Sequence, residues 1–293
     1  MSLVERLYSY GRLVRFSHTI FALPFALASV ALAWPTHPVR LNILLWILLA
    51  MVGARSAAMG FNRLVDKKLD ALNPRTQGWE LPRGTVKFWE AVLLTLVTSL
   101  VFVFAAYQLN QTCFILSPVA LAVIFFYSLT KRFTWTSHLF LGLALSLAPL
   151  GAWLAVAGSP IDLEELKIPL FLGAAVLFWL AGFDVIYSLQ DLDFDRGQGL
   201  KSIPVRFGVA GALRLSSFFH FCTVIFLALV GLAAGAGMIY WLGYLAVTAV
   251  LLWEHRIVTP DDLSRINRAF FDFNAYVSLG YLLTIITDLA WRS

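Results

Sequence analysis

The chain has 293 residues, of which 60% are hydrophobic and only 13% are charged. A soluble domain averages roughly a quarter charged residues, and the mean hydropathy of this chain is +0.79. The composition therefore excludes an ordinary soluble domain and predicts an integral membrane protein. The net charge of +5 reflects an asymmetry between loops, so no nucleic-acid partner is expected.

Apolar runs near the ~20 residues that a helix needs to cross a bilayer occur along the whole chain. They predict nine transmembrane helices, at residues 17–34, 41–62, 87–107, 112–130, 136–157, 168–190, 212–234, 237–253 and 270–290. Pro24 and Pro149 fall inside two of these ranges, which a helical bundle in lipid tolerates. The predicted fold is an all-α membrane protein with nine transmembrane helices, forming one domain over residues 1–293.

Lysines and arginines are distributed unevenly between the two sets of loops. Eighteen of the 22 lie at the amino terminus, in the loops after the second, fourth, sixth and eighth helices, or in the first residues of the helices that follow these loops, and three lie on the opposite side. Positive loops face the cytoplasm, so the amino terminus is predicted to be cytoplasmic and the carboxyl terminus external. The remaining one, Arg55, lies inside the second predicted helix.

The first strongly polar segment begins where the second predicted helix ends, and it reads GFNRLVDKKLDALNPRT. Asn62, Asp66 and Asp70 are four residues apart, which is the repeat of one helix face. Arg55, seven residues before Asn62, falls on the same face at 100° per residue. A polar stripe is therefore predicted to run from inside the membrane to the cytoplasmic end of this helix.

A similar segment follows the sixth predicted helix and reads GFDVIYSLQDLDFDRGQGLKSIPVRFG. On one continuous helix, Asp184, Asp191 and Asp195 share a face, with Tyr187 beside them. Both segments begin Gly-Phe-Asn/Asp, carry carboxylates four residues apart and end in a basic stretch that contains proline. This similarity indicates weakly repeated halves. The corresponding motif loops are expected at residues 62–86 and 184–211.

Carboxylates four residues apart on one helix repel each other, and an isolated charge inside a span costs at least ~2.5–3.5 kcal/mol. Polar stripes of this kind persist only where they face each other, water or a ligand, and two such carboxylate pairs indicate that a divalent cation is bound. Oxygen ligands near basic residues suit Mg²⁺ that bridges a polyphosphate, and Lys and Arg can bind the remaining phosphate charge. The predicted metal ligands are Asp66, Asp70, Asp191 and Asp195. The basic candidates are Lys67, Lys68, Arg75, Arg83, Lys201 and Arg206, with an ordinary loop role as an equal alternative for Lys67 and Lys68.

On these motifs the chain resembles the UbiA superfamily of intramembrane aromatic prenyltransferases, over nearly its whole length. The family motifs N-x₃-D-x₃-D and Y-x₃-D-x₃-D match NRLVDKKLD and YSLQDLDFD after the second and sixth helices. Other matching stretches are FSHTIFALPFAL, NPRT, YSLTKRFTW, LGLALSLAPLGAW and KSIPVRFG. The sequence of these stretches is most similar to the 4-hydroxybenzoate polyprenyltransferase branch of the family. That branch includes a subgroup that prenylates a dihydroxynaphthoate for menaquinone by the futalosine route.

The resemblance implies an enzyme that uses Mg²⁺ to transfer a polyprenyl group from an allylic polyprenyl diphosphate to the ring of 4-hydroxybenzoate. The product would serve respiratory quinone (ubiquinone) biosynthesis. Prenylation of a dihydroxynaphthoate is the alternative. The implied location is the bacterial inner (cytoplasmic) membrane, as a multi-pass protein whose active site faces the cytoplasm.

The resemblance also assigns roles to single residues. Asn62 and the four aspartates would hold Mg²⁺ and the diphosphate, and Arg55 would bind the carboxylate of the acceptor. The further substrate-binding candidates are Lys131, Arg75 and Lys201. Tyr187 and Asp191 are the catalytic candidates, with Asp191 able to assist deprotonation of the phenol.

Two positions depart from the usual sequence of the family motifs. Arg63 follows Asn62 where many members have aspartate, and Trp79 stands where many members have arginine. Neither departure changes a predicted metal ligand. A secondary transporter is the rival class, because such proteins also carry repeated motifs and intramembrane charge. The acids of this chain gather at one rim and no predicted helix centre holds a carboxylate, which favours the enzyme.

Overall fold

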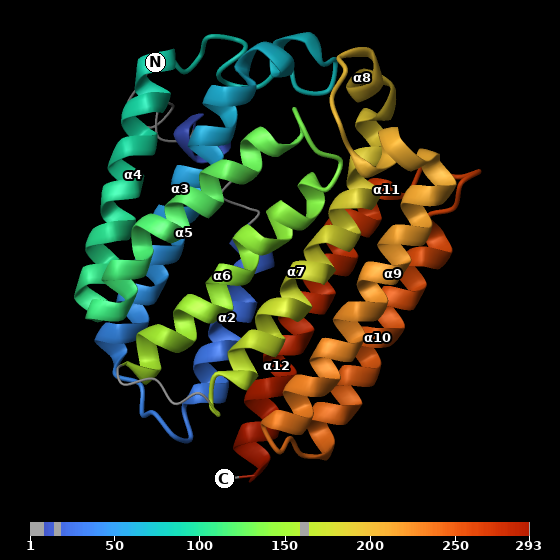
Figure 1. Ribbon diagram of the computed structural model, residues 1–293. Helices are drawn as coiled ribbons and strands as arrows, with labels where there is room; N and C mark the ends of the chain where they lie inside the picture. Colours follow the sequence, from blue (N-terminus) through green and yellow to red (C-terminus); the bar gives the residue numbers. More distant parts are fainter. Residues whose placement is uncertain (1–8, 15–18, 159–163, 293) are drawn as a thin grey trace. The chain divides into compact units, whose positions relative to one another are not determined.

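The computed structural model describes residues 9–14, 19–158 and 164–292 (Figure 1). Apart from one isolated bridge between Thr259 and Asp262, the regular structure in these ranges is helical, which confirms the all-α prediction. The long helices are α2 (Thr19–Ala33), α3 (Leu41–Leu72), α4 (Phe88–Leu109), α5 (Gln111–Thr130), α6 (Ser137–Ala157), α7 (Lys167–Ser188), α9 (Ile203–Ala233), α10 (Met238–Ile257) and α12 (Asn274–Arg292).

Within the described ranges, seven helical segments are long and apolar enough to cross a membrane. They are α3, α4, α5, α6, α9, the segment Lys167–Gly197 and the segment Ile266–Arg292. The other two long helices, α2 and α10, are not among these seven segments. α2 has 15 residues, and α10 carries His255 and Arg256 in its last turn. Every predicted range overlaps one helix, while the count of nine membrane spans stays a prediction.

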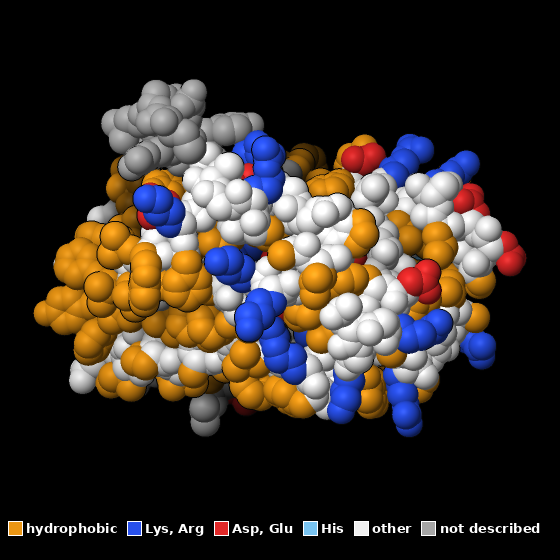
Figure 2. Space-filling model, turned by 90° about the horizontal axis from the view of Figure 1, so that it is seen from above, with side chains coloured by type: hydrophobic (Ala, Val, Ile, Leu, Met, Phe, Trp, Pro, Cys, Tyr) orange, Lys and Arg blue, Asp and Glu red, His pale blue; other side chains and the backbone are white. Residues whose placement is uncertain are grey.

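Large hydrophobic side chains remain exposed along the helices, as expected for a protein surrounded by lipid. On α4, for example, Leu93, Leu96 and Leu100 are all exposed. Figure 2 shows such side chains beside lysines and arginines that project from the surface. Exposed apolar area of this extent is unfavourable in water, so the surface supports the membrane assignment made from composition.

The chain divides into two compact units, and the first comprises residues 1–19 and 41–129. In this unit α3 packs along α4, and glycine allows the close approach. A Cβ atom at Gly53 would lie 2.9 Å from the backbone nitrogen of Phe102 on α4. Phe61 on α3 also stacks on Phe125 of α5, with ring centroids 4.5 Å apart. These contacts fix α3, the helix that carries the first polar motif.

The second unit comprises residues 20–40 and 130–293, and α7 is its central helix. Figure 1 shows α6 and α9 beside α7, and α10 packs against both α9 and α12. Trp179, near the middle of α7, is fully buried and contacts the rings of Phe25 and Phe183, each with a centroid 4.9 Å away. This aromatic core holds α7 in place up to the point where the second polar motif begins.

The second motif is helical but not one straight α-helix, so the single face expected for it stays a prediction. α7 ends at Ser188, a 3₁₀ turn covers Leu189–Asp191, and the short helix α8 covers Leu192–Gly197. A 3₁₀ turn advances about 120° per residue instead of about 100°. Over three residues this turns Asp191 and Asp195 by about 60° relative to Asp184, so the three aspartates are spread more widely than on a straight α-helix.

The two expected motif loops also contain more helix than predicted. α3 continues to Leu72, past its predicted end at residue 62. α9 has a short first stretch that begins at Ile203, and Gly208, with a non-helical φ of 69°, forms a kink between this stretch and the long part of the helix, which was expected from residue 212. Ser202 caps α9, because its hydroxyl accepts a hydrogen bond from the Val205 backbone N–H at 3.4 Å. Pro204 suits the first turn, where its missing N–H costs nothing. Hydropathy alone does not detect such polar helical ends.

Gly142 on α6 lies against α7, where a Cβ atom would collide with the carbonyl of Leu177. We expect Gly142→Ala to destabilise the protein by about 1–3 kcal/mol, because overpacking forces the two helices apart. Gly151→Ala on the same helix is a matched control, since nothing lies within 4 Å of its Cβ position. Thermal unfolding in detergent measures both variants. Equal midpoints would contradict this account of how α6 packs on α7.

Candidate functional site

The first polar motif lies on the last turns of α3, and both of its carboxylates are buried. Asp66 is 3% exposed and Asp70 is 8% exposed. The side-chain amide of Asn62 donates a hydrogen bond to Asp66 Oδ2 at 3.2 Å. This bond places Asn62 and Asp66 together on one helix face, as their four-residue spacing predicts.

Arg55 lies on α3 about two turns before Asn62, in the hydrophobic part of the helix. Its Nε atom is buried and has no hydrogen-bond partner within the described part of the chain. Arg55 as a whole is half-buried, but a buried donor that lacks an acceptor is costly. Arg55 is therefore suited to bind an anionic group that reaches this part of α3.

The loop after α3 fixes the end of the helix. The hydroxyl of Thr76 donates to the Asp70 carbonyl at 2.9 Å, and the Asn73 N–H donates to the Leu69 carbonyl at 3.0 Å. The side-chain oxygen of Asn73 in turn accepts from the Arg75 backbone N–H at 2.9 Å. These bonds satisfy groups that a helix end leaves free, and they hold Arg75 close to the end that carries Asp70.

Arg63 contacts the first motif directly, although sequence reasoning did not place it among the site residues. It is 6% exposed, and its Nη1 atom lies 3.4 Å from Asp70 Oδ2. Its Cζ atom lies 3.7 Å from the ring centroid of Trp79. The signal in the sequence is spacing: Arg63 precedes Asp70 by seven residues, which is two helical turns and the same face.

The second motif follows the end of α7 in the second unit. Asp191 ends the 3₁₀ turn, and Asp195 lies on α8, where its backbone carbonyl accepts from the Leu200 N–H at 2.9 Å. Tyr187, in the last turn of α7, stacks on Phe270 with ring centroids 4.0 Å apart and planes at 28°. The ring of Tyr187 is therefore fixed, while the two aspartates belong to a separate short segment.

Asp184, the first aspartate of the predicted polar stripe, has a structural partner on α6. Its Oδ2 atom lies 2.7 Å from His138 Nδ1 on α6. The Ile203 backbone N–H donates to the other ring nitrogen, His138 Nε2, at 3.4 Å, so the proton of a neutral ring is on Nδ1 and is donated to Asp184. The pair thus ties α6, α7 and the start of α9 together, and His138 has no free nitrogen for proton transfer.

Lys131 and Lys201 were predicted as phosphate-binding residues from separate stretches, and the structure brings these stretches together within the second unit. The Lys201 backbone N–H donates to the Lys131 carbonyl at 2.7 Å. The Lys201 ammonium group donates to the Phe133 carbonyl at 3.2 Å. The turn after α5 and the segment before α9 therefore present two lysines side by side in the chain's second unit.

The carboxylates of both motifs suit a hard divalent cation, because their donor atoms are all oxygen. The first unit supplies Asp66 and Asp70, and the second supplies Asp191 and Asp195. In residues 9–14, 19–158 and 164–292, no three or more His, Cys, Asp or Glu side chains form a group that could hold a metal ion. Mg²⁺ commonly takes one or two carboxylates together with substrate phosphates, so each pair fits as part of such a site.

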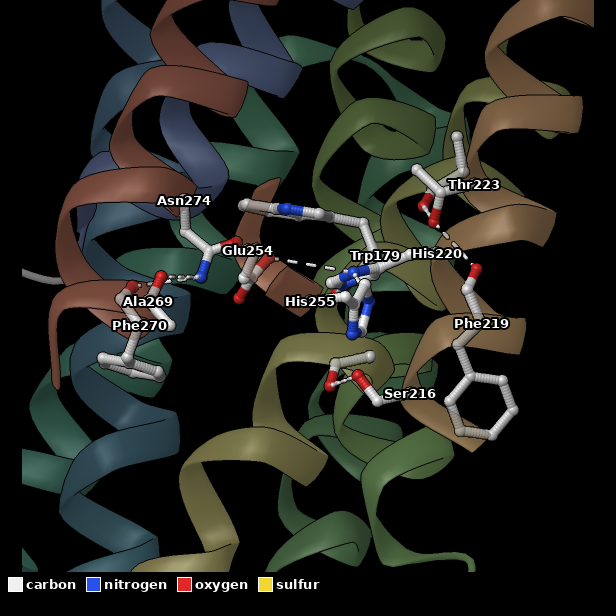
Figure 3. Close-up of polar contacts among 12 residues, drawn as sticks. Trp179, Ser216, Phe219, His220, Thr223, Glu254, His255, Ala269, Phe270 and Asn274 are labelled. Carbon is white, nitrogen blue, oxygen red and sulfur yellow. Dashed lines mark hydrogen bonds and ion pairs between the residues drawn. The ribbon is translucent and has the colours of Figure 1, made fainter. Parts of the chain in front are cut away.

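The interior of the second unit holds another polar cluster, where α7, α9 and α10 meet (Figure 3). Glu254 is 0% exposed, and among the described residues neither of its carboxylate oxygens has a hydrogen-bond partner. His220 Nδ1 lies 3.7 Å from Glu254 Oε2 and 2.9 Å from His255 Nε2, and its Nε2 lies 3.2 Å from the Trp179 carbonyl oxygen. The cluster links three helices and shares no residue with either motif.

Comparison with known protein families agrees with the motifs. The family model described as the UbiA prenyltransferase family matches residues 22–278. A 4-hydroxybenzoate octaprenyltransferase of Nitrosospira multiformis is 31% identical over 309 aligned positions, which cover 100% of this chain and 99% of that protein. The 4-hydroxybenzoate octaprenyltransferase of Marinobacter nauticus is 29% identical, over 98% of this chain and 96% of that protein.

Solved structures share the fold. The apo structure of a UbiA homolog from Aeropyrum pernix K1 is 34% identical and has a TM-score of 0.84, covering 93% of this chain and 98% of that chain. A UbiA homolog from Archaeoglobus fulgidus, bound to DMAPP and Mg²⁺, has a TM-score of 0.69 at 22% identity, over 93% and 99% of the two chains. At that identity the second likeness concerns the fold alone.

Proposed function

The chain belongs to the UbiA prenyltransferase family, and we propose that it transfers a polyprenyl group from a polyprenyl diphosphate to the ring of 4-hydroxybenzoate. The observation that carries the proposal is Arg55, a half-buried arginine whose Nε atom is buried and has no hydrogen-bond partner among the described residues. It lies on the same helix as Asn62, Asp66 and Asp70, so α3 offers both a carboxylate-binding group and part of a metal–diphosphate site. The two octaprenyltransferases described above support a benzoate acceptor.

The donor's diphosphate is assigned to the two Asp motifs and to nearby cations. The four aspartates of the motifs would hold Mg²⁺, which when bound neutralises the charge that develops on the leaving diphosphate. Asn62 orients the Asp66 carboxylate through its hydrogen bond. Arg75, Lys131 and Lys201 supply the further positive charge that phosphate oxygens require.

Transfer breaks the allylic C–O bond of the donor and forms a C–C bond at the ring carbon ortho to the phenol. Diphosphate leaves with the bonding electron pair, and the ring carbon then loses its proton. Arg55 orients the acceptor through its carboxylate group. Tyr187, in the last turn of α7, and Asp191, at the end of the following 3₁₀ turn, are assigned to proton transfer from the phenol. The apolar helices exclude water from the reacting allylic group.

The enzyme is proposed to be a multi-pass protein of the bacterial inner membrane, with its amino terminus and active site on the cytoplasmic side. The support is the excess of Lys and Arg in one set of loops and the exposed apolar side chains of the long helices. The polyprenyl tail would lie along these apolar helices, since contact with water costs about 0.8 kcal/mol for each CH₂ group that could be buried.

The test is product formation by the purified protein in lipid, with polyprenyl diphosphate and Mg²⁺. Separate reactions contain 4-hydroxybenzoate or a dihydroxynaphthoate, and mass spectrometry identifies the products. We expect prenylated 4-hydroxybenzoate, and no product after chelation of the metal. Prenylated naphthoate alone would move the enzyme to menaquinone synthesis. Counterflow of the acceptor without any product would overturn the enzyme in favour of a transporter.

A further inference from the structure

The contact between Arg63 and Asp70 is weak for a pair so deeply buried. Its nitrogen–oxygen distance of 3.4 Å exceeds the roughly 2.7–2.9 Å of a strong charge-assisted hydrogen bond. Water solvates neither charge well, because the two side chains are largely buried. The distance of 3.7 Å from Arg63 Cζ to the centroid of the Trp79 ring is typical of a cation–π interaction. The indole therefore helps to hold the guanidinium in place, and the long contact with Asp70 is weak enough to be exchanged.

The loop after α3 fixes Trp79 in this position. The Trp79 N–H donates to the Thr76 carbonyl at 2.9 Å, and the Trp79 carbonyl accepts from the Arg83 N–H at 3.0 Å. A second guanidinium, that of Arg75, lies 5.7 Å from the same ring. Two arginines are thus gathered around one indole at the end of α3, and guanidinium groups match the geometry of phosphate oxygens.

The single negative charge of the Asp70 carboxylate cannot neutralise both Arg63 and a divalent cation at the same time. A metal ion that binds the Asp70 carboxylate places two positive charges within a few ångströms of the guanidinium, in surroundings where water screens them poorly. Diphosphate relieves this repulsion, because it brings several anionic oxygens that both cations can share. Metal alone therefore has to displace Arg63, whereas metal together with diphosphate offers it a new partner.

Resting on the proposed function, we propose that Arg63 is an exchangeable diphosphate-binding residue. It pairs with Asp70 before the donor arrives and passes to the diphosphate when the metal occupies Asp70. Trp79 keeps the guanidinium in place during the exchange. By this exchange Arg63 couples the binding of metal to the binding of donor.

Arg63→Gln tests the exchange, because it should move two affinities in opposite directions. Mn²⁺ alone, followed by electron paramagnetic resonance, is expected to bind the variant about threefold to tenfold more tightly, since the competitor for Asp70 is gone. Inorganic pyrophosphate is expected to bind the Mn²⁺-loaded variant about tenfold more weakly, because a hydrogen bond from a charged donor is lost.

Two further variants serve as controls. Lys87→Gln removes an equal charge from an exposed position before α4 in the same unit, and it is expected to change both affinities by less than about twofold. Trp79→Leu should weaken pyrophosphate binding without tightening Mn²⁺ binding, because Arg63 keeps its charge beside Asp70.

A parallel loss of both affinities in Arg63→Gln would indicate a structural role and overturn the proposal. Affinities equal to those of the wild type would overturn it as well. Failure of the proposed function has a different signature, namely the absence of any prenylated aromatic product from the wild-type protein, whatever the two affinities of the variant are.

Discussion

Asparagine in place of Asp66 is expected to lower prenyl transfer by at least about a hundredfold, and Asp191→Asn is expected to do the same. Each substitution keeps the size of the side chain and removes one carboxylate charge from one motif. Mg²⁺ depends on carboxylate ligands, and loss of one electrostatic stabiliser of a transition state costs about 10²–10³ in kcat. Product formation in membranes supplied with polyprenyl diphosphate and 4-hydroxybenzoate measures the effect.

Asp193→Asn is the matched control for this pair of variants. Asp193 lies between Asp191 and Asp195 in the chain, on α8, and is exposed. We expect it to retain activity within about twofold, as is usual for a surface substitution. Thermal unfolding of all three variants separates loss of chemistry from loss of folding. Transfer near the wild-type rate in either Asp66→Asn or Asp191→Asn would contradict the metal assignment.

Arg55→Ala is expected to raise the KM for 4-hydroxybenzoate by about 30- to 700-fold, which corresponds to about 2–4 kcal/mol. The reason is that the acceptor carboxylate would lose its only assigned cationic partner in a site shielded from water. The KM for the polyprenyl diphosphate should stay within about threefold of the wild-type value, since Arg55 is assigned to the acceptor. Steady-state kinetics with each substrate varied in turn measures both constants.

An acceptor without a carboxylate provides the control for Arg55. With phenol as acceptor, wild type and Arg55→Ala should perform alike, because the interaction that the variant removes is absent in both. Arg55→Lys keeps the positive charge but loses the planar guanidinium with its several N–H donors. Its KM for 4-hydroxybenzoate should therefore lie between the values of the wild type and of Arg55→Ala. A raised KM for the donor with an unchanged KM for the acceptor would reassign Arg55 to the diphosphate.

Sequence periodicity predicted the helices well where hydrophobic residues continue to both helix ends. α4 (Phe88–Leu109) and α6 (Ser137–Ala157) begin and end within two residues of the expected ranges. Asn62 and Asp66 also lie on one helix face as predicted, because α3 continues without a break through the first motif. The second motif is less regular, since a 3₁₀ turn interrupts it, and nothing in the hydrophobic pattern indicates that turn.

Side-chain contacts between different helices and loops could not be predicted from the sequence of each segment taken alone. His138 and Asp184 are 46 residues apart, and periodicity within one helix says nothing about which side chain of another helix it meets. The contact between Arg63 and Trp79 depends on how the loop after α3 folds back, which is decided by hydrogen bonds such as that from Thr76 to the Asp70 carbonyl. Such residues are found only after the chain is folded.

The central proposal is that Asp66, Asp70, Asp191 and Asp195 hold Mg²⁺ and the diphosphate of the donor. A crystal structure with Mn²⁺ and an unreactive thiolo analogue of the donor tests it, because anomalous scattering locates manganese directly. The account predicts manganese about 2.1 Å from oxygens of Asp66 or Asp70 and also from oxygens of Asp191 or Asp195, with diphosphate bridging them. Manganese coordinated by the aspartates of one unit alone, or bound at neither motif, would contradict it.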